Sequence, residues 1–428
     1  MGHVVAARAQ MGTSLAFHIV FAALGVGLPV LALIAEGLWL RTRDRTYYDL
    51  ARTWAKAMAI LFAVGAVSGT VLAFELGLLW PEFMRYAGGI IGLPFSLEGF
   101  AFFIEAIFIG LYLYGWERLS PVGHWLTIFP VAISGAISAA FVTCANAWMN
   151  MPTGFRIVNG QATDVQPLAA MFSPPWQTEV LHTTLAAYVF TAFGVASVYA
   201  VAWLRGKRSA KVLAGIRLAM LMAVVAIPLQ IIAGDISARF DAEQEPVKFA
   251  SLEALYHTQP AAPVTIGGIV DQAHARTIGA LEIPGALSFL VAGNPHAVVR
   301  GLDAFPASDE PPLEIVHLSF DLMVGSGTLL LVIAAWWLLA TRAKSREPGR
   351  PLARALAISS LLALAALEAG WVVTEMGRQP WIARGLLRTD QAVTIVPGLD
   401  ITFYAFSVLY VILGALCWWL VARLGAHQ

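Results

Sequence analysis

Two carboxylates stand inside one of the most apolar stretches of the chain. Glu98 and Glu105 belong to the run Pro94-Phe-Ser-Leu-Glu-Gly-Phe-Ala-Phe-Phe-Ile-Glu-Ala-Ile-Phe108. Their spacing of seven residues places both on one face of a helix, ~10.5 Å apart along its axis. Because an ionisable residue at the centre of a membrane helix costs about 2.5–3.5 kcal/mol, two of them on one face indicate a purpose. Two purposes fit the pattern: the carboxylates relay protons, or they form hydrogen bonds that join neighbouring helices.

A second set of residues has the chemistry of iron ligands. His18, His182, Met323 and Glu368 each fall inside an apolar segment. Histidine, methionine and carboxylate all bind iron, and a His with a Met saturates a haem iron, which suits electron transfer. A haem held on one side by His or Glu keeps a position open for a gas. Taken singly, each of these residues is more often a packing residue than a ligand.

The composition indicates that membrane helices hold these residues. The chain is 58% hydrophobic and 13% charged, with a mean hydropathy of +0.72, whereas soluble domains carry about 25% charged residues. The formal net charge of +0 gives no sign of a nucleic-acid partner. Cys144 and Cys417 lie in apolar segments, which predicts that both pack as small core residues. We predict an all-α integral membrane protein with nine transmembrane helices, at residues 14–40, 56–80, 95–115, 124–147, 177–204, 213–234, 314–341, 353–375 and 399–423.

Basic residues sort the connections between these helices by side. Connections rich in Arg and Lys alternate with poorer ones, which hold Arg85 or Arg156, and this alternation predicts an external N-terminus and a cytoplasmic C-terminus. The last external turn breaks the trend with Arg378, Arg384 and Arg388. This orientation puts the four candidate iron ligands in the outer half of the membrane. Glu98, near the external start of its helix, lies at the same level, and Glu105 lies deeper. The rich connections carry Arg41, Arg43, Arg45 and Arg52 after the first helix, Arg205, Lys207, Arg208 and Lys211 after the fifth, and Arg342, Lys344, Arg346, Arg350 and Arg354 after the seventh.

One external connection is long enough to be a unit of its own. Residues 235–313 contain eight prolines, and a connection of this length is usually functional. Within it, residues 248–256 have the pattern of a short amphipathic helix. The chain therefore divides into helices one to six (1–234), the external loop (235–313) and helices seven to nine (314–428). Histidines near helix ends, such as His124, are expected to face solvent, and His317 is left unassigned.

Several separated motifs share one family pattern. The chain resembles subunit I of the cytochrome bd-type quinol oxidases from about Ala7 to its last helix. It also resembles the short-loop branch of that family, including its cyanide-insensitive type. The motifs are Arg8-Ala-Gln10, Phe17-His18, Phe74-Glu-Leu-Gly77-Leu-Leu-Trp80, Leu97-Glu98-Gly99, Phe103-Ile-Glu105, Gly115-Trp116-Glu117-Arg118, Ala145-Asn146-Ala-Trp148-Met149, His182-Thr183, Lys248, Glu253, Thr258-Gln-Pro260, Met323-Val-Gly325, Glu368-Ala-Gly-Trp371 and Gly377-Arg-Gln-Pro-Trp381.

The resemblance implies a fold of two four-helix bundles plus a peripheral helix, and three haems. His182 and Met323 would be the axial ligands of a low-spin haem b. His18 and Glu368 would each hold one of two high-spin haems, a haem b and a haem d or a further haem b in its place. Arg378 stands beside the haems by topology, where an arginine neutralises propionates.

The resemblance also implies roles for the remaining candidates. Glu98 would lie at the oxygen-reducing haems, and Glu105 on a proton path from the cytoplasm. Lys248 and Glu253 would belong to the external loop that oxidises quinol, called the Q-loop in this family. Asp321 is a departure, because some relatives carry Arg there; an acid near a haem requires another partner or lowers the potential.

The function implied is a terminal quinol oxidase of the bacterial inner membrane, which reduces O2 to water and generates proton motive force without pumping. Its partners would be a homologous subunit II, often a small single-span subunit, quinol, O2 and the lipid membrane. Two alternatives are a proton-coupled transporter without haem and a haem b electron-transfer subunit that does not react with O2.

Overall fold

The computed structural model describes residues 2–342 and 347–426, so Lys344 and Arg346 of the basic set lie outside the described part. Within it, nine helices are long and apolar enough to span a membrane, as predicted. They are α1 (His3–Thr42), α2 (Arg45–Leu79), α3 (Pro81–Tyr114), α4 (Pro121–Asn150), α6 (Trp176–Leu204), α7 (Ala210–Gln244), α10 (Leu313–Arg342), α11 (Arg350–Gly377) and α13 (Leu399–Ala426).

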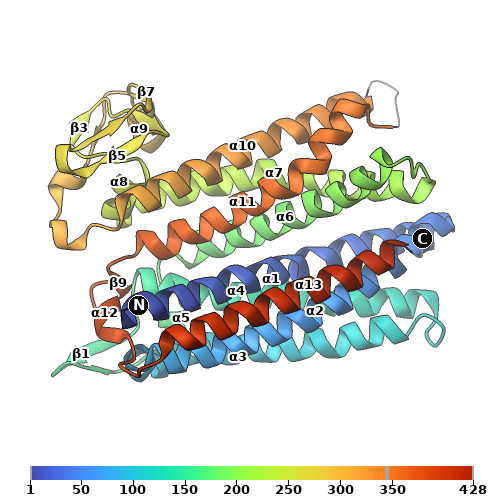
Figure 1. Cartoon of the computed structure of the whole chain (residues 1–428), viewed down its shortest axis with the longest axis horizontal. Coiled ribbons are helices and arrows are strands. Elements are labelled where there is room, and N and C mark those ends of the chain that lie inside the picture. Colours follow the sequence, from blue (N-terminus) through green and yellow to red (C-terminus); the bar gives the residue numbers. More distant parts are fainter. Residues whose placement is uncertain (1, 343–346, 427–428) are drawn as a thin grey trace.

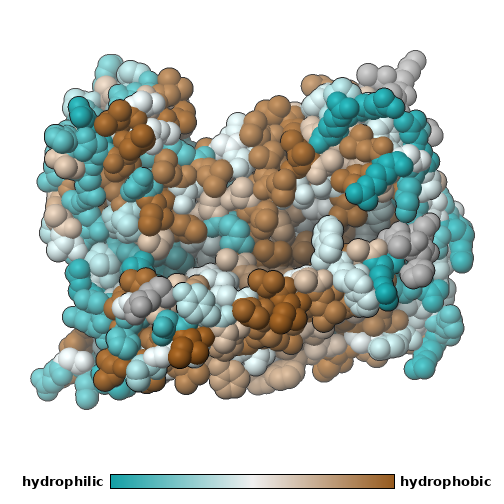
Figure 2. Space-filling model, viewed as in Figure 1, coloured by the Kyte–Doolittle hydropathy of each residue, from teal (hydrophilic) through white to brown (hydrophobic). Residues whose placement is uncertain are grey.

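The long helices form two bundles and one peripheral helix (Figure 1), which confirms the predicted architecture. Helices α1 to α4 pack together, and α6, α7, α10 and α11 form the second bundle. Helix α13 lies against α1 and α2 at the edge of the first bundle. The bundles meet where α6 packs on α1 and α4. Figure 2 shows apolar side chains across the middle of one face and hydrophilic ones at both ends, as expected for a lipid-facing band.

Most helices run further than their apolar cores suggested, because local capping extends them. Proline stands at the first position of α3 and of α4, where its missing N–H costs nothing. Asp44 caps α2 by accepting a hydrogen bond from the Thr46 amide at 2.8 Å. Since α3 begins at Pro81, Glu98 lies in the middle of that helix and not near its start. The expectation that it stands at the external beginning of a helix was wrong.

The long connection forms a small folded unit at the end of the bundles where the N-terminus lies, with the C-terminus at the opposite end (Figure 1). It starts after α7, which continues to Gln244, and opens with α8 (Pro246–Leu252), somewhat shorter than the predicted amphipathic helix. Its other elements are β3 (Gln259–Pro260), β4 (Val264–Ile266), β5 (Ile269–Asp271), η1 (Gln272–His274), β6 (Arg276–Ile278), β7 (Leu281–Ile283), α9 (Ala286–Ala292), β8 (Val298–Val299), η2 (Leu302–Ala304) and η3 (Ala307–Asp309).

Short elements complete the same end of the molecule. The five sheets of the described residues are all antiparallel pairs, β1 with β2, β3 with β8, β4 with β7, β5 with β6 and β9 with β10. The elements not yet named are β1 (Arg156–Val158), β2 (Gln161–Thr163), α5 (Pro167–Met171), β9 (Trp381–Ala383), β10 (Leu387–Arg388) and α12 (Thr389–Ala392). Cys144 and Cys417 are buried, as predicted.

Candidate functional site

The four candidate iron ligands lie on four different helices. His18 belongs to α1, His182 to α6, Met323 to α10 and Glu368 to α11. All four side chains are half-buried. His182 and Met323 therefore belong to the second bundle, whereas His18 belongs to the first. Glu368 lies on α11, a helix of the second bundle that packs on α6 and also touches α1.

Three of these side chains are packed against glycines of neighbouring helices. A Cβ added to Gly69 would lie 2.9 Å from His18 Cε1, and one added to Gly370 would lie 3.1 Å from Met323 Sδ. At Gly234 the added Cβ would lie 3.4 Å from His182 Cε1. Because glycine has no side chain, Gly69, Gly370 and Gly234 leave room for the imidazole rings and the thioether to pack closely against the neighbouring helices. We call these close contacts the glycine cradles.

The imidazole of His18 has one nitrogen committed to the protein. Its Nδ1 lies 2.9 Å from Ser68 Oγ. The Ser68 hydroxyl lies 3.0 Å from the carbonyl oxygen of Val64, which can only accept, so the hydroxyl can donate to that carbonyl. In this arrangement Nδ1 of His18 carries the ring proton and donates to Ser68. This tautomer leaves Nε2 with a free lone pair, which is the state of a metal-binding histidine.

His182 is contacted by the side chain of Gln230 on α7. The amide nitrogen of Gln230 lies 3.0 Å from Nε2 and 3.3 Å from Nδ1 of the ring. The amide oxygen of Gln230 is buried without a hydrogen bond among the described residues. His182 thus has a polar neighbour on one side and the cradle of Gly234 beside it.

The carboxyl group of Glu105 on α3 lies close to one glycine of α1 and one glycine of α4. Its side chain is buried, and its Oε1 would lie 3.8 Å from a Cβ added to Gly25 and 3.6 Å from one added to Gly135. Pro29 removes the N–H that would bond the carbonyl of Gly25 within α1. A free backbone acceptor therefore lies beside this carboxyl group. Glu98 shares the α3 face with Glu105 and is half-buried.

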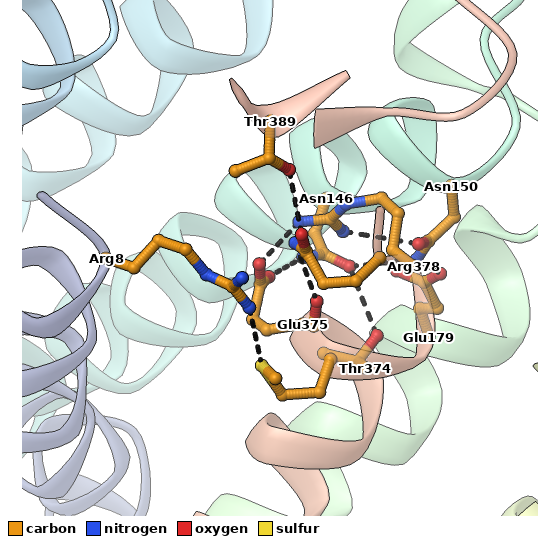
Figure 3. Close-up of polar contacts among 10 residues, drawn as sticks. Arg8, Asn146, Asn150, Glu179, Thr374, Glu375, Arg378 and Thr389 are labelled. Carbon is orange, nitrogen blue, oxygen red and sulfur yellow. Dashed lines mark hydrogen bonds and ion pairs between the residues drawn. The ribbon is translucent and has the colours of Figure 1, made fainter. Parts of the chain in front are cut away.

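Arg378 is buried at the end of α11 in a polar network that joins both bundles (Figure 3). It forms a close ion pair with Glu375, and its Nη1 donates to Asn150 Oδ1 at 3.2 Å. Asn150 in turn donates to Glu179 at 2.8 Å, and Asn146 donates to Glu375 at 2.6 Å. The network already gives the guanidinium a carboxylate partner. Its Nε is buried without a hydrogen bond in the described part of the chain, so one donor is left for a further acceptor.

Lys248 is buried in an ion cluster rather than exposed to solvent. Its Nζ lies 2.9 Å from Glu245 Oε2 and 3.1 Å from Asp241 Oδ2, and Arg384 lies 3.5 Å from Glu245. Burial alone would lower the pKa of Lys248, but Asp241 and Glu245 hold it above its usual range. Burial opposes ionisation of Glu245 as well, yet the ammonium of Lys248 keeps the pKa of that carboxyl below its usual range. Both groups are therefore charged at neutral pH.

A cavity of about 140 Å³ opens beside this ion cluster. Three of the residues around it are cations, which suits an acceptor or an anionic group. The residues that line it are Val247, Lys248, Asp309, Gly377, Arg378, Gln379, Trp381, Arg384 and Gly385.

Glu253 is buried directly after α8. Burial raises the pKa of Glu253 to about 8, with a further contribution from the nearby charge of Asp321. Its Oε2 is buried without a hydrogen bond among the residues described. A carboxyl group with this pKa can exchange protons near neutral pH.

Asp321 finds partners in the long connection and on its own helix. Its Oδ2 accepts a hydrogen bond from the Gly267 amide at 2.6 Å and lies 3.4 Å from His317 Nε2. His317 is fully buried, and its Nδ1 donates to the carbonyl of Leu252 at 2.8 Å. His317 and Asp321 thereby attach the long connection to α10, the helix that carries Met323.

Sequence reasoning missed several buried ionisable groups. Glu75 is buried and accepts a hydrogen bond from Gln10 at 2.9 Å. His124 is not solvated as expected; it is buried within α4 and bonds to Glu36 of α1. The spacing of three between Glu375 and Arg378 was a readable signal for an ion pair on one helix, but Glu36 and His124 have no local pattern.

Comparison with known proteins identifies the class. The family model of cytochrome bd terminal oxidase subunit I matches residues 6–428. The chain therefore belongs to that family, and it is a multi-pass oxidoreductase of the bacterial inner membrane.

Individual relatives match over nearly their whole length. A Bacillus subtilis (strain 168) protein provisionally named cytochrome bd menaquinol oxidase subunit I is 39% identical over 422 residues, covering 97% of this chain and 95% of the relative. Cytochrome bd ubiquinol oxidase subunit 1 of the same organism is 32% identical over 438 residues, covering 99% and 93%. The bd oxidase structure from Geobacillus thermodenitrificans matches with a TM-score of 0.95 at 37% identity, covering 100% of this chain and 99% of that one.

Proposed function

We propose that this chain is the haem-carrying subunit of a terminal oxidase that oxidises quinol at the external face and reduces oxygen to water. The observation that carries the proposal is the family match over residues 6–428, within which all four candidate ligands sit on transmembrane helices. The proposed partners are a homologous subunit II and a small single-span subunit, with quinol and O2 as substrates in the lipid membrane.

The donor set fits haem iron. His182 and Met323 would hold a low-spin haem b, and His18 and Glu368 would hold a high-spin haem b and a haem d, or a further haem b in its place. The free Nε2 of His18 and the glycine cradles beside His18, His182 and Met323 support this assignment. When bound, these groups would carry electrons from quinol and bind the oxygen that is reduced.

Arg378 would serve the same groups from the external end of α11. Its guanidinium is held by Glu375 and Asn150, and its unbonded Nε offers a donor to a propionate. The buried position supports a shared role, in which Glu375 orients the guanidinium and the propionate completes its hydrogen bonds.

The quinol side would use Glu253 as the proton acceptor. A carboxylate within reach of the quinol hydroxyl can take its proton, and the pKa of about 8 keeps this group near the balance point at neutral pH. Lys248 would fix the start of the loop through Asp241 and Glu245 and present its charge toward the cavity beside it.

Protons for oxygen reduction would come from the cytoplasmic side. Glu105 would receive them and pass them along the shared face of α3 to Glu98, which would lie at the oxygen site. Two quinols release four electrons and four protons outside, and one O2 takes four electrons and four cytoplasmic protons to form two waters. Charge is separated across the membrane because protons are released on the external side and taken up from the cytoplasmic side, so no proton pump is needed.

One set of spectra tests the proposal. The dithionite-reduced purified complex is expected to show haem absorption, a pyridine haemochrome that distinguishes haem b from haem d, and a carbon monoxide shift from open high-spin haems. Absence of haem absorption would support the haem-free transporter and end the oxidase proposal. Haem absorption without a carbon monoxide shift would instead support an electron-transfer subunit that does not meet oxygen.

A further inference from the structure

A histidine and a glutamate are buried together between α1 and α4. His124 and Glu36 are 2% and 0% exposed, and Nδ1 of the imidazole lies 2.6 Å from Glu36 Oε1. The other ring nitrogen, Nε2, lies 2.8 Å from the carbonyl oxygen of Tyr112. A carbonyl oxygen only accepts, so Nε2 carries a proton. The short contact between Nδ1 and Oε1 is a hydrogen bond between the ring and the carboxyl group.

The indole nitrogen of Trp116 is buried without a hydrogen-bond partner within the described residues, and Glu36 Oε2 and the hydroxyl of Tyr112 have no partner there besides each other. The rings of Tyr112 and Trp116 lie on the imidazole, with centroids 4.6 Å and 4.1 Å from that of His124. Buried polar atoms of native proteins are nearly always bonded, so unpaired ones gathered in one place indicate sites for ordered water.

A cavity of about 270 Å³ lies at the end of the bundle where α3 meets α4, separated from the buried pair by Trp116. Trp116 forms part of its wall, so the ring that covers His124 also faces the cavity. The basic connections predict that this end is cytoplasmic. The charged groups there are Arg52 and Lys56 of α2 and Glu117 and Arg118 after α3, with Arg52 and Glu117 3.8 Å apart. The residues lining the cavity are Arg52, Lys56, Leu113, Tyr114, Trp116, Glu117 and Arg118.

On α1 and on α4, the residue near Glu105 and the residue of the His124–Glu36 pair lie on the same face of the helix. On α1, Gly25 contacts Glu105, and Glu36 follows eleven residues later. On α4, Gly135 contacts Glu105, and His124 precedes it by eleven residues. Eleven residues make about three turns, so each partner lies on the face that reaches Glu105, ~16 Å further toward the cavity.

The spacing of residues on α3 gives the same alignment. Tyr112 follows Glu105 by seven residues on α3, which is the spacing that also puts Glu98 on this face. Glu98, Glu105 and Tyr112 therefore form one line that ends at the buried pair.

We infer that His124 and Glu36 form the proton-loading station of the route to Glu105. In the resting state the pair holds one shared proton and has no net charge. Glu36 would release that proton through Oε2 to water on the Glu105 side, leaving a neutral imidazole and a carboxylate. A proton from cavity water would then restore the pair. This inference rests on the proposed proton route through Glu105.

The simpler explanation is that the pair only fastens α1 to α4. A buried pair kept for packing is expected to have its second carboxylate oxygen fully hydrogen-bonded, because a buried unpaired oxygen is destabilising. Here that oxygen faces only the hydroxyl of Tyr112, which can itself take up and release a proton, and the unbonded indole nitrogen of Trp116 lies next to the cavity. A proton relay uses such exchangeable groups, whereas a purely structural contact does not need them.

The variant Glu36→Gln tests the inference in the complete purified complex. Glutamine keeps the shape and accepts from His124 Nδ1–H, but it cannot release a proton. Oxygen consumption with excess quinol is expected to fall about tenfold, with haem content and the rate of haem reduction by quinol unchanged. Wild-type turnover in a variant with full haem content would overturn the inference.

Two controls separate the possible failures. Trp125→Phe removes the hydrogen bond from the neighbouring indole to the Leu33 carbonyl, at 3.0 Å, and so weakens the same helix contact without touching a proton carrier. Its turnover is expected to stay at the wild-type rate. Glu105→Gln tests the route itself: if it is slow and Glu36→Gln is not, the loading station is wrong and the route stands. If Glu105→Gln is unaffected, the proposed route fails.

A second measurement does not depend on the pair surviving substitution. Leu113→Cys places a thiol in the cavity wall, and both native cysteines of this chain are buried. A bulky methanethiosulfonate reagent applied to this complex, with the labelled wild type as control, is expected to slow turnover severalfold and reversibly. Complete labelling without any loss of turnover would contradict entry through this cavity, whatever the outcome for Glu36→Gln.

Discussion

The ionisation of Glu253 makes the proposed quinol reaction dependent on pH. With its pKa at about 8, roughly a tenth of this carboxyl group is ionised at pH 7 and roughly a hundredth at pH 6. Only the ionised form can accept the quinol proton, so kcat/KM for quinol is expected to rise about tenfold per pH unit and to level off above about 8. At its ordinary pKa of 4.5, the group would be ionised throughout this range and give no such slope.

Substitution of the carboxyl group provides the measurement. Glu253→Gln is expected to lower kcat/KM about 100-fold or more at pH 8 and to abolish the slope, because no base remains at this position. The assay is oxygen uptake with a short-chain quinol between pH 6 and 9, corrected for autoxidation without enzyme. Glu282→Gln is the matched control, since it makes the same change in an exposed residue of the same loop and should leave the profile intact.

The neighbouring acid provides a further check on the cause. Burial is the main reason for the raised pKa of Glu253, and the charge of Asp321 adds to it. Asp321→Asn should therefore move the midpoint of the profile to lower pH without removing it. A Glu253→Gln enzyme with the wild-type slope and rate would refute the assignment of this residue as the base.

Three further substitutions have defined outcomes. His182→Ala should remove the low-spin haem signal while high-spin haem remains, and a full low-spin signal would contradict the ligand assignment. Ser68→Ala removes the acceptor that fixes the tautomer of His18, so high-spin haem retention should weaken about 10–100-fold in a titration of haem binding; Thr70→Ala, an exposed change on the same helix, should have no effect. Glu105→Gln should slow oxygen consumption about 100-fold with full haem content, and normal turnover would count against the proton path.

The pattern of apolar segments was sufficient to predict the helices, because each must cross the membrane on its own residues. All nine appear in the described chain, and the motifs placed His18, His182, Met323 and Glu368 on the helices that hold them. The ends were predicted less well. Capping by Asp44 and the first-turn proline Pro81 extend helices beyond their apolar cores, as the start of α3 shows.

The partners of buried ionisable groups could not be read from the sequence. Glu36 and His124 are 88 residues apart, and Arg378 and Asn150 are 228 apart, so no local spacing connects them. Local pairs such as Glu245 and Lys248 are readable in principle, because three residues bring side chains together on one helical turn.

The sequence by itself determined which residues lie in the membrane and which of them have the chemistry for iron and protons, since hydropathy and residue type are local properties. The tertiary structure decided which of these groups meet. Packing of α1 and α4 against α3 brought Gly25 and Gly135 to Glu105, and it buried a His124 that stands at the edge of an apolar segment. Burial and pairing depend on neighbours far along the chain, and only the folded bundles supply those neighbours.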